Sequence, residues 1–275
     1  MGSLYIIATP IGNLEDITLR ALRLLKEVSL IAAEDTRTTR KLLTHYGIRN
    51  RLVSYHQFSR PDRVRDLVQR LEDEDIALVS DAGMPCLSDP GYPLVREAIA
   101  NGVAVVPIPG ASSITSALAI SGLPTDQFTF IGFLPRRTQE RKKLFQQLAD
   151  EPRTIVALES PHRVKKTLQD LTTYLPDRPL AVCRELTKQF EEVFRGTPAE
   201  ALEHFATPRG EFTLVLGGCD ISAQTQWAPG EADDTSAHVP SPRWERDRVR
   251  EASPAEALPA PKSSRERKAR KAAII

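Results

Sequence analysis

The fold is decided by the stretch Ile76-Ala-Leu-Val-Ser-Asp-Ala-Gly-Met-Pro85. Its first residues form a short apolar run of the kind that predicts a buried strand. An aspartate, a glycine and a proline follow at once and predict a tight turn with exposed backbone amides. The same order recurs along the chain, where short β-branched runs alternate with segments of helical period. Such alternation indicates crossover connections and mainly parallel sheets with helices on both faces.

The predicted strands fall into two sets. The first set comprises residues 4–8, 30–33, 52–55, 76–80 and 103–108, and the second comprises residues 128–132, 154–158, 180–184 and 212–216. The predicted helices occupy residues 18–26, 38–46, 62–72, 92–101, 113–121, 140–148, 161–174 and 198–205. We therefore predict an α/β fold of two αβα domains, residues 1–122 and 123–220, with a ligand cleft between them.

The C-terminal part of the chain has a different composition. From about Gly217 the apolar periodicity stops, and proline, alanine, serine and charged residues take over. Such a segment cannot bury enough apolar surface to offset its conformational entropy. We predict that residues 221–275 are mostly disordered, with a basic end that either contacts RNA or is simply solvated.

Composition limits the class of protein. The 275 residues are 41% hydrophobic and 27% charged, which is typical of a soluble globular protein, and no run approaches the roughly 18 apolar residues of a membrane span. The start of the chain lacks the charged region of a signal peptide. Cys86, Cys183 and Cys219 are too far apart for a disulfide framework or a cysteine-rich metal site and suit a reducing compartment. We expect a cytoplasmic protein with no metal and no membrane association.

The net charge is only +1, so the chain lacks the overall positive charge that would indicate a nucleic-acid partner. Any contact with RNA has to come from local basic clusters.

Two loops at predicted strand ends have the composition of tight turns, and strand ends are where ligands collect in open α/β sheets. Thr9-Pro-Ile-Gly-Asn-Leu14 resembles neither a dinucleotide-binding nor a P-loop motif, so these two classes of site lose support. Taken alone, this loop is more consistent with a simple turn than with a ligand site. In Ser80-Asp-Ala-Gly-Met-Pro85 we expect Asp81 to face a ligand, whereas Asp89, close behind, is expected to cap the helix that begins near Gly91.

Two further loops combine a strand end with a helix start. Pro109-Gly-Ala-Ser-Ser113 offers free backbone N–H groups to an anion, although such a sequence taken alone is more often just a capped helix start. Glu34 and Asp35 stand directly before Arg37, Arg40 and Lys41. These charges either pair with each other at the surface or present arginine and lysine to phosphates.

Together the loops resemble one family. The motifs, in chain order, are Thr9-Pro-Ile-Gly-Asn-Leu14, Ala33-Glu-Asp-Thr-Arg37, Leu78-Val-Ser-Asp-Ala-Gly-Met-Pro85, Ser88-Asp-Pro-Gly-Tyr92, Pro107-Ile-Pro-Gly-Ala111, Gly132-Phe-Leu-Pro135, Glu159-Ser-Pro-His-Arg163, Arg184-Glu-Leu-Thr-Lys188 and Gly210-Glu-Phe-Thr-Leu-Val215. In this order they resemble the tetrapyrrole (corrin/porphyrin) methylase superfamily. Within it they are similar to the enzymes that methylate the ribose 2′-hydroxyl of a cytidine in the decoding centre of small-subunit ribosomal RNA. The resemblance covers residues 4–217.

The resemblance implies a homodimer that holds S-adenosylmethionine between the two domains and acts on small-subunit ribosomal RNA in an assembled 30S particle. The cofactor-binding residues that it implies are Pro10, Gly12, Ser80, Asp81, Ala82, Gly83, Met84, Pro109, Gly110, Ala111, Ser112, Ser113, Phe133, Leu134 and Thr213. Met84 stands where the family more often has a threonine, so a hydroxyl contact there is not expected.

Methylation of a ribose needs a group that assists a weakly nucleophilic hydroxyl. The candidate catalytic residues are Glu185, Lys188 and Asp35, with His56 as a further possibility. Lys188 acts as a base if burial lowers its pKa, or as a cation that stabilises the oxygen; Glu185 would orient it. The predicted RNA-binding residues are Arg37, Arg40, Lys41, Arg60, Arg136 and Arg137, although such clusters are also common on solvated helices.

Two other functions stay open. One is methylation of a porphyrin or corrin precursor, against which the first loop lacks the glycine-rich form found in tetrapyrrole enzymes. The other is a ribosome assembly factor that binds RNA without catalysis and would not bind the cofactor.

Overall fold

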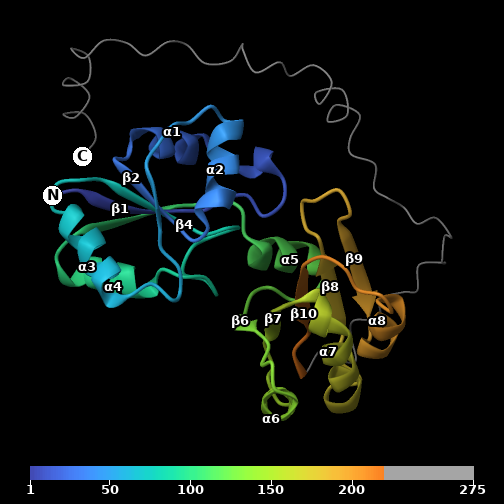
Figure 1. Cartoon of the computed structure of the whole chain (residues 1–275). Helices are drawn as coiled ribbons and strands as arrows, with labels where there is room; N and C mark the ends of the chain where they lie inside the picture. The colour runs from blue at the N-terminus through green and yellow to red at the C-terminus, as the bar shows by residue number, and fades with distance from the viewer. Residues whose placement is uncertain (220–275) are drawn as a thin grey trace, which may run out of the picture. The chain divides into compact units, whose positions relative to one another are not determined.

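Two five-stranded sheets follow one another along the chain in the computed structural model, which describes residues 1–219 (Figure 1). The first sheet has the order β3-β2-β4-β1-β5, and every neighbouring pair is parallel. Its strands are β1 (Ser3–Ile7), β2 (Leu30–Ala33), β3 (Leu52–Ser54), β4 (Ile76–Val79) and β5 (Ala104–Ile108). The predicted parallel sheet is confirmed, and each strand lies within a residue or two of its predicted place.

Helices cover both faces of the first sheet because its side chains alternate. In β2, Ile31 and Ala33 pack beneath α1 (Leu19–Glu27) and α2 (Thr36–His45), whereas Leu30 and Ala32 pack beneath α3 (Pro61–Arg70) and α4 (Tyr92–Ala100). All four residues are buried, as expected for a central strand of a parallel sheet. A short 3₁₀ helix, Leu14–Asp16, precedes α1.

The second sheet differs from the prediction. Its order is β6-β7-β10-β8-β9, and of its described strand pairs only β6–β7 is parallel. The strands are β6 (Phe128–Phe133), β7 (Thr154–Glu159), β8 (Leu180–Arg184), β9 (Glu192–Gly196) and β10 (Phe212–Leu216). The α/β class is confirmed, but mainly parallel strands describe the first sheet and not the second.

The reason is β9, which the sequence analysis missed. β8 and β9 form an antiparallel pair, so the chain reverses direction between them. After β9 the chain crosses over through a helix into β10, which runs parallel to β9. Strand β10 lies between β7 and β8 and is antiparallel to both. β9 is an edge strand whose residues are only partly buried and include Glu192 and Arg195, so it lacks the apolar run that marks the other strands.

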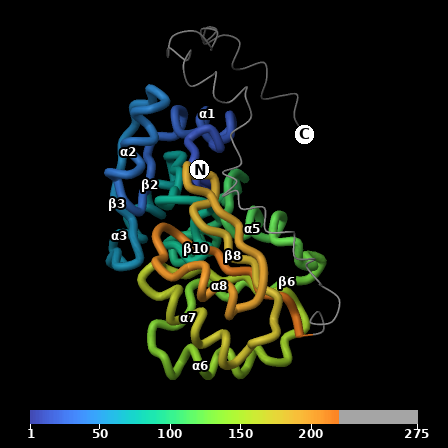
Figure 2. Tube along the Cα trace, turned by 90° about the vertical axis from the view of Figure 1, so that its right-hand side faces the viewer, coloured from blue at the N-terminus to red at the C-terminus, as the bar shows by residue number. Residues whose placement is uncertain are grey.

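The second sheet also has two covered faces. Ile155, Val182 and Leu214 pack against α6 (Thr138–Gln147), α7 (Pro161–Tyr174) and α8 (Pro198–His204). Figure 2 shows α7 and α8 beside each other at this sheet. The opposite face, with Val156 and Val215, packs against α5 (Ser113–Ser121).

Helix α5 connects the two sheets. It begins directly after the loop that follows β5, yet its buried residues Ile114, Ala117 and Leu118 join a cluster with Ala181 and Val215 of the second sheet. The chain passes to the second sheet between Ser121 and Phe128. We refer to the two α/β parts as the first and second lobes and keep the division at 122/123 as a proposal.

The described residues belong to one compact unit. The predicted tail, residues 221–275, lies outside the described residues. Within residues 1–219, no helix is long and apolar enough to cross a membrane.

We expect Leu118→Ala to destabilise the protein by about 2–4 kcal/mol, because it opens a cavity between α5 and the second sheet. Leu118 is 5% exposed, whereas Leu19 is 82% exposed and provides the matched control. Leu19→Ala should change the unfolding free energy by less than about 0.5 kcal/mol. Urea unfolding followed by circular dichroism measures both, and equal effects would contradict this role of α5.

Candidate active site

A cavity of about 590 Å³, called here the central cavity, lies at the carboxyl edge of the first sheet and is closed by the second lobe. The loops after all five strands of the first sheet contribute to it. Ile11 follows β1, Glu34 follows β2, Gln57 follows β3, Asp81 follows β4 and Ser112 follows β5. This edge is where open parallel sheets bind ligands, because loops and helix N-termini converge there.

The second lobe supplies the opposite wall. Phe133 lies at the end of β6, Glu159 at the end of β7, Cys183 near the end of β8, and Phe212 and Thr213 at the start of β10. Because β10 runs antiparallel to β7 and β8, its start lies at the same edge as their ends. The unpredicted topology therefore brings all these residues to one wall.

The structure places about half of the predicted cofactor residues in the lining of the central cavity. They are Asp81, Ala82, Gly83, Met84, Ser112, Ser113, Phe133 and Thr213. The others, Pro10, Gly12, Ser80, Pro109, Gly110, Ala111 and Leu134, are not in the lining.

Leu134 does not fit its predicted role. Its side chain is buried in the core of the second lobe with Phe145, and its backbone N–H bonds to the carbonyl of Leu158. Phe133 and Leu134 are neighbours in one motif, so both were expected to contact the cofactor. In a strand-like backbone, however, successive side chains point to opposite sides, so only Phe133 faces the cavity.

Other residues outside the lining shape the cavity through the backbone. Thr9 and Gly83 exchange backbone hydrogen bonds of 2.9 and 3.0 Å, which join the loops after β1 and β4. The Ser80 hydroxyl donates to carbonyls inside its own turn. A Cβ on Gly110 would lie 3.0 Å from the Cβ of Ala8, so glycine allows the β5 loop to approach β1 closely.

Gly12 allows a similarly close approach between the two lobes. A Cβ at this position would lie 2.4 Å from the Cγ of Lys188 and 2.8 Å from the Oγ1 of Thr187. The next residue, Asn13, donates its backbone N–H to the Thr187 hydroxyl over 3.1 Å. The first loop thus packs directly on the loop that carries Lys188.

Lys188 lies between two carboxylates. Its Nζ is 2.9 Å from Oε1 of Glu185 and 3.0 Å from Oε2 of Glu211. Burial lowers the pKa of Lys188, but the hydrogen bonds to the two glutamates outweigh burial, and the net effect raises the pKa. The structure therefore favours the cation over the base among the two predicted roles of Lys188.

Glu185 and Glu211 are tied together. Burial alone would raise the pKa of Glu185, but hydrogen bonds from Lys188 and from the backbone N–H of Glu211 lower it. Neither Lys188 nor Glu185 lines the central cavity, whereas Glu211 does. The sequence analysis missed Glu211, although it stands in a recognised motif, Gly210-Glu-Phe-Thr.

The first-lobe wall carries three carboxylates, on Glu34, Asp81 and Asp89. Burial raises the pKa of Glu34 and of Asp81. Burial, followed by the charge of Glu34, raises the pKa of Asp89 to about 6. A wall with three such carboxylates complements a cationic ligand or one rich in hydroxyl donors.

The capping role predicted for Asp89 is wrong. Helix α4 has Gly91 as its N-cap, with no side-chain capping bond, and Asp89 lines the cavity instead. The sequence Asp89-Pro-Gly91 allows the aspartate either to cap α4 or to line the cavity. In the structure it lines the cavity, and the residue before it, Ser88, has a left-handed backbone with φ of 66°.

Asp35 does not fit a catalytic role. Its Oδ1 accepts the backbone N–H of Arg37 over 2.8 Å at the start of α2, and its Oδ2 pairs with the Arg37 guanidinium at 2.7 Å. These bonds to Arg37 lower the pKa of Asp35 to about 2, so at neutral pH it is a poor proton acceptor. The charges of this loop were expected either to pair with each other or to contact phosphates. Asp35 and Arg37 pair with each other.

His56 holds a turn. Its Nδ1 accepts the backbone N–H of Phe58 over 3.2 Å, and its own N–H donates to the Ser59 hydroxyl. His56 does not line the central cavity, whereas its neighbour Gln57 does.

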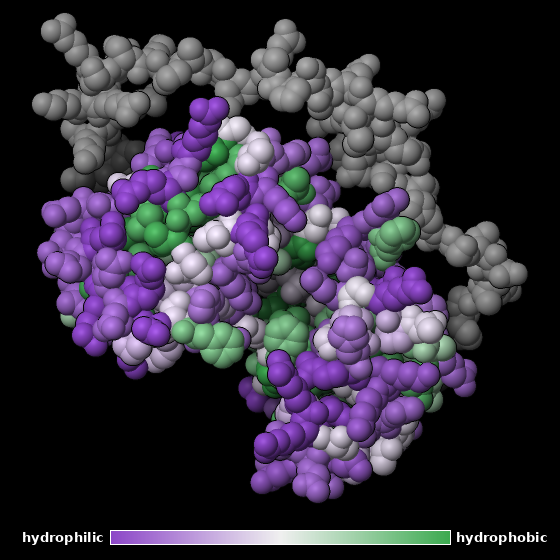
Figure 3. Space-filling view, in the orientation of Figure 1, coloured by the Kyte–Doolittle hydropathy of each residue, from purple (hydrophilic) through white to green (hydrophobic). Residues whose placement is uncertain are grey.

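The predicted RNA-binding residues are dispersed. Arg136 lines the central cavity, and Arg60 lines a second hollow beside α3. Arg37 and Arg137 pair with Asp35 and Glu140, and Arg40 and Lys41 are exposed on α2. Figure 3 shows a largely hydrophilic surface on both lobes, so exposure alone does not single out an RNA-binding face.

Left-handed backbone is concentrated beside the cavity. Within residues 1–219, the non-glycine residues with positive φ are Cys86, Ser88, Glu185 and Thr187. They belong to the two loops, after β4 and after β8, that face each other across the site. Such conformations cost energy and occur most often at functional sites, which agrees with a site here.

Comparison with known sequences identifies relatives over most of the chain. The sequence model of the Tetrapyrrole (Corrin/Porphyrin) Methylases matches residues 3–202. A protein named ribosomal RNA small subunit methyltransferase I from Halalkalibacterium halodurans is 52% identical over 79% of this chain and 76% of its own length. The protein of the same name from Thermotoga maritima is 48% identical over 79% of this chain and 99% of its own length.

Solved structures share the fold at low sequence identity. A diphthine synthase superposes with a TM-score of 0.63 at 15% identity, over 78% of this chain and 90% of its own. The uroporphyrin-III C-methyltransferase of Thermus thermophilus, in complex with S-adenosyl homocysteine, superposes with a TM-score of 0.55 at 21% identity, over 80% and 99%.

Asp89→Asn tests the buried carboxylate. Because the pKa of Asp89 is about 6 in the fold and near 3.8 otherwise, its ionisation destabilises the protein as pH rises from about 4 to about 6. The variant should remove that slope and raise the unfolding free energy at pH 7.5 by about 1 kcal/mol, a value reduced for partial exposure. Thermal unfolding between pH 4 and 8 measures this. Asp126→Asn, at an exposed site, is the control and should leave the slope in place.

Proposed function

The chain belongs to the tetrapyrrole (corrin/porphyrin) methylase family, and from this premise we propose that it methylates the ribose 2′-hydroxyl of a cytidine in the decoding centre of small-subunit ribosomal RNA. The broader activity is S-adenosylmethionine-dependent methylation of small-subunit ribosomal RNA, in keeping with the relatives that share about half of its residues. The cytidine, its 2′-oxygen and the decoding centre are the proposed part.

The observation that carries the proposal is one cavity with two chemically different walls. The central cavity, at about 590 Å³, is within the range of small-molecule sites. Ser112 and Ser113 place the N-terminus of α5 at the cavity, where backbone N–H groups suit a carboxylate. Asp81 and Asp89 suit amine, sulfonium and hydroxyl groups. These features fit S-adenosylmethionine.

S-adenosylmethionine, when bound, supplies an electrophilic methyl group. The residues of the chain have to hold the acceptor oxygen roughly 3–3.5 Å from it and in line. We assign the acceptor side to the second-lobe wall, where Glu211 and Thr213 line the cavity and Glu211 pairs with Lys188, which lies just outside the lining. Lys188, as a cation, donates a hydrogen bond to the ribose oxygen and stabilises the negative charge that develops on it. Glu185 positions Lys188 through their ion pair.

We also propose that the enzyme acts as a homodimer in the cytoplasm, on an assembled 30S particle. Three free cysteines suit that compartment, since Cys86, Cys183 and Cys219 form no disulfide. Arg136 in the cavity lining and Arg60 beside α3 are the predicted RNA-binding residues that lie in hollows of the structure.

The deciding experiment is methyl transfer to purified particles. 30S subunits from cells that lack the enzyme are incubated with the full chain and methyl-labelled S-adenosylmethionine. We expect label on one cytidine ribose, located by nuclease mapping and mass spectrometry. Label on a base would correct the acceptor atom. Label on an added porphyrinoid but not on RNA would support the small-molecule alternative, and absence of cofactor binding by calorimetry would support the non-catalytic one.

Lys188→Met should lower kcat by about 100-fold or more, since it removes a charge placed for the transition state. Lys188→Arg keeps the charge and should retain part of the rate, and Lys166→Met, on the exposed face of α7, should behave as wild type. Single-turnover labelling of 30S subunits measures kcat, and calorimetry with S-adenosyl homocysteine checks that the cofactor site is intact. A Lys188→Met rate close to wild type would exclude the proposed role.

A further inference from the structure

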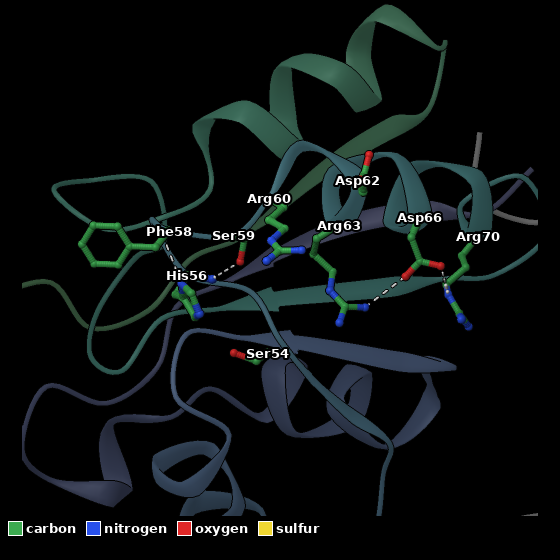
Figure 4. Close-up of a pocket in the computed structure, with 9 residues that line it drawn as sticks. All are labelled: Ser54, His56, Phe58, Ser59, Arg60, Asp62, Arg63, Asp66 and Arg70. Carbon is green, nitrogen blue, oxygen red and sulfur yellow. Dashed lines mark hydrogen bonds and ion pairs between the residues drawn. The ribbon is translucent and has the colours of Figure 1, made fainter.

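A second hollow, of about 730 Å³, lies beside helix α3 and outside the central cavity (Figure 4). We call it the α3 groove, and the residues that matter for its chemistry are Ser54, Phe58, Arg60, Arg63, Asp66 and Arg70. We propose that the α3 groove binds a single-stranded RNA segment that flanks the target nucleotide, with one base stacked on Phe58 and phosphates on the arginines. This inference rests on the proposed function and assigns part of its substrate site.

The groove carries a row of arginines at helical spacing. Arg60 is the N-cap of α3, and Arg63 and Arg70 follow on the same face; Figure 4 shows all three side chains directed to one side of the helix. From Arg60 to Arg70 the row extends roughly 15 Å along the helix, which is enough for more than one phosphate. Arginine forks suit phosphate oxygens.

The positive charge in the row is only partly compensated. Asp66 pairs with both Arg63, at 3.1 Å, and Arg70, at 3.2 Å. Asp62 pairs with Arg65, which is outside the groove. Within residues 1–219, the backbone carbonyl of Arg60 accepts the N–H of Arg63, but its guanidinium has no hydrogen-bond or ion-pair partner. An anion at the groove would therefore meet one free guanidinium and two that share a single carboxylate.

Phe58 adds an aromatic face at the end of the row. Its side chain is 79% exposed, so the ring is accessible to a ligand. The bond from its N–H to His56 Nδ1 holds its backbone in place, so the ring is offered on an ordered turn. Exposed aromatic rings beside arginines are the stacking platforms of proteins that bind single-stranded RNA, where bases are unstacked and available.

The same turn connects the groove to the central cavity. His56 and Phe58 line the groove, whereas Gln57 between them lines the central cavity. In the proposal, an RNA strand whose target nucleotide enters the central cavity would pass this turn and reach Phe58. Continuity of the two hollows at one tripeptide is the reason to assign the groove to the same RNA molecule.

The test compares groove variants with matched controls in the full chain. Phe58→Ala is compared with Phe128→Ala, an exposed phenylalanine at the start of β6 and outside both hollows, and Arg60→Gln is compared with Arg65→Gln, an arginine of α3 outside the groove. Binding is measured with 30S subunits and with a short single-stranded RNA oligonucleotide over a range of salt. Thermal unfolding and calorimetry with S-adenosyl homocysteine check fold and cofactor site.

Phe58→Ala should weaken RNA binding about 5-fold or more with an unchanged salt dependence. Arg60→Gln should also weaken it and reduce the slope of log affinity against log salt by about 1. In methyl transfer, KM for 30S subunits should rise in both variants while kcat at saturation stays near wild type. The controls should match wild type in each measurement.

Groove variants that match their controls would overturn the inference while leaving the proposed function intact, provided that the wild type methylates 30S subunits. A loss confined to 30S subunits, with oligonucleotide binding unchanged, would overturn it too, because it would assign the groove to a ribosomal protein. A wild type that does not label ribosomal RNA would instead refute the proposed function itself.

Discussion

The site depends on one packing interaction, the burial of helix α5 against the second sheet. The helix begins at the carboxyl edge of the first sheet, and Ile114, Ala117 and Leu118 lie in a shared core with Ala181 and Val215. Because the loop before α5 is part of the cavity wall, this core fixes the distance between the two walls. The close contact of Gly12 with Lys188 is a second place where the two lobes pack directly on each other.

The two walls carry different charged groups, and the residues around each group determine its state. The first lobe contributes Glu34, Asp81 and Asp89 from loops that follow adjacent strands, and burial raises the pKa of each. The second lobe contributes Arg136, Glu159 and Glu211 to the lining, and Glu211 pairs with Lys188, whose pKa is raised by its bonds to Glu185 and Glu211. In the proposed function, the carboxylates of the first wall complement the positive charge of the methyl donor. The unfavourable burial of the carboxylates is offset when a cation binds beside them.

How much of this the sequence predicted depends on the kind of interaction. Strand–turn–helix units such as residues 76–100 are local, so periodicity and turn residues located them well. Strand β9 was missed because Glu192 and Arg195 interrupt its apolar pattern, and with it the reversal that makes the second sheet mostly antiparallel. Asp35 and Asp89 exchanged their expected roles, since a sequence does not state which carboxylate meets an arginine. Glu211 was missed because its partner, Lys188, is brought to it by β8 and β10 pairing.

The state of Lys188 also constrains the chemistry. Burial alone would favour the neutral amine and make Lys188 a base, but the hydrogen bonds to Glu185 and Glu211 have the larger combined effect. In the proposed reaction, the proton of the ribose hydroxyl would leave toward another acceptor, and the Glu211 carboxylate is the one in the cavity lining that contacts Lys188. Displacement at a sulfonium carbon needs little charge on the oxygen before the new bond forms. In the proposed reaction, the Glu211 carboxylate and the Lys188 cation assist the acceptor, and the packing of the two walls holds donor and acceptor in line.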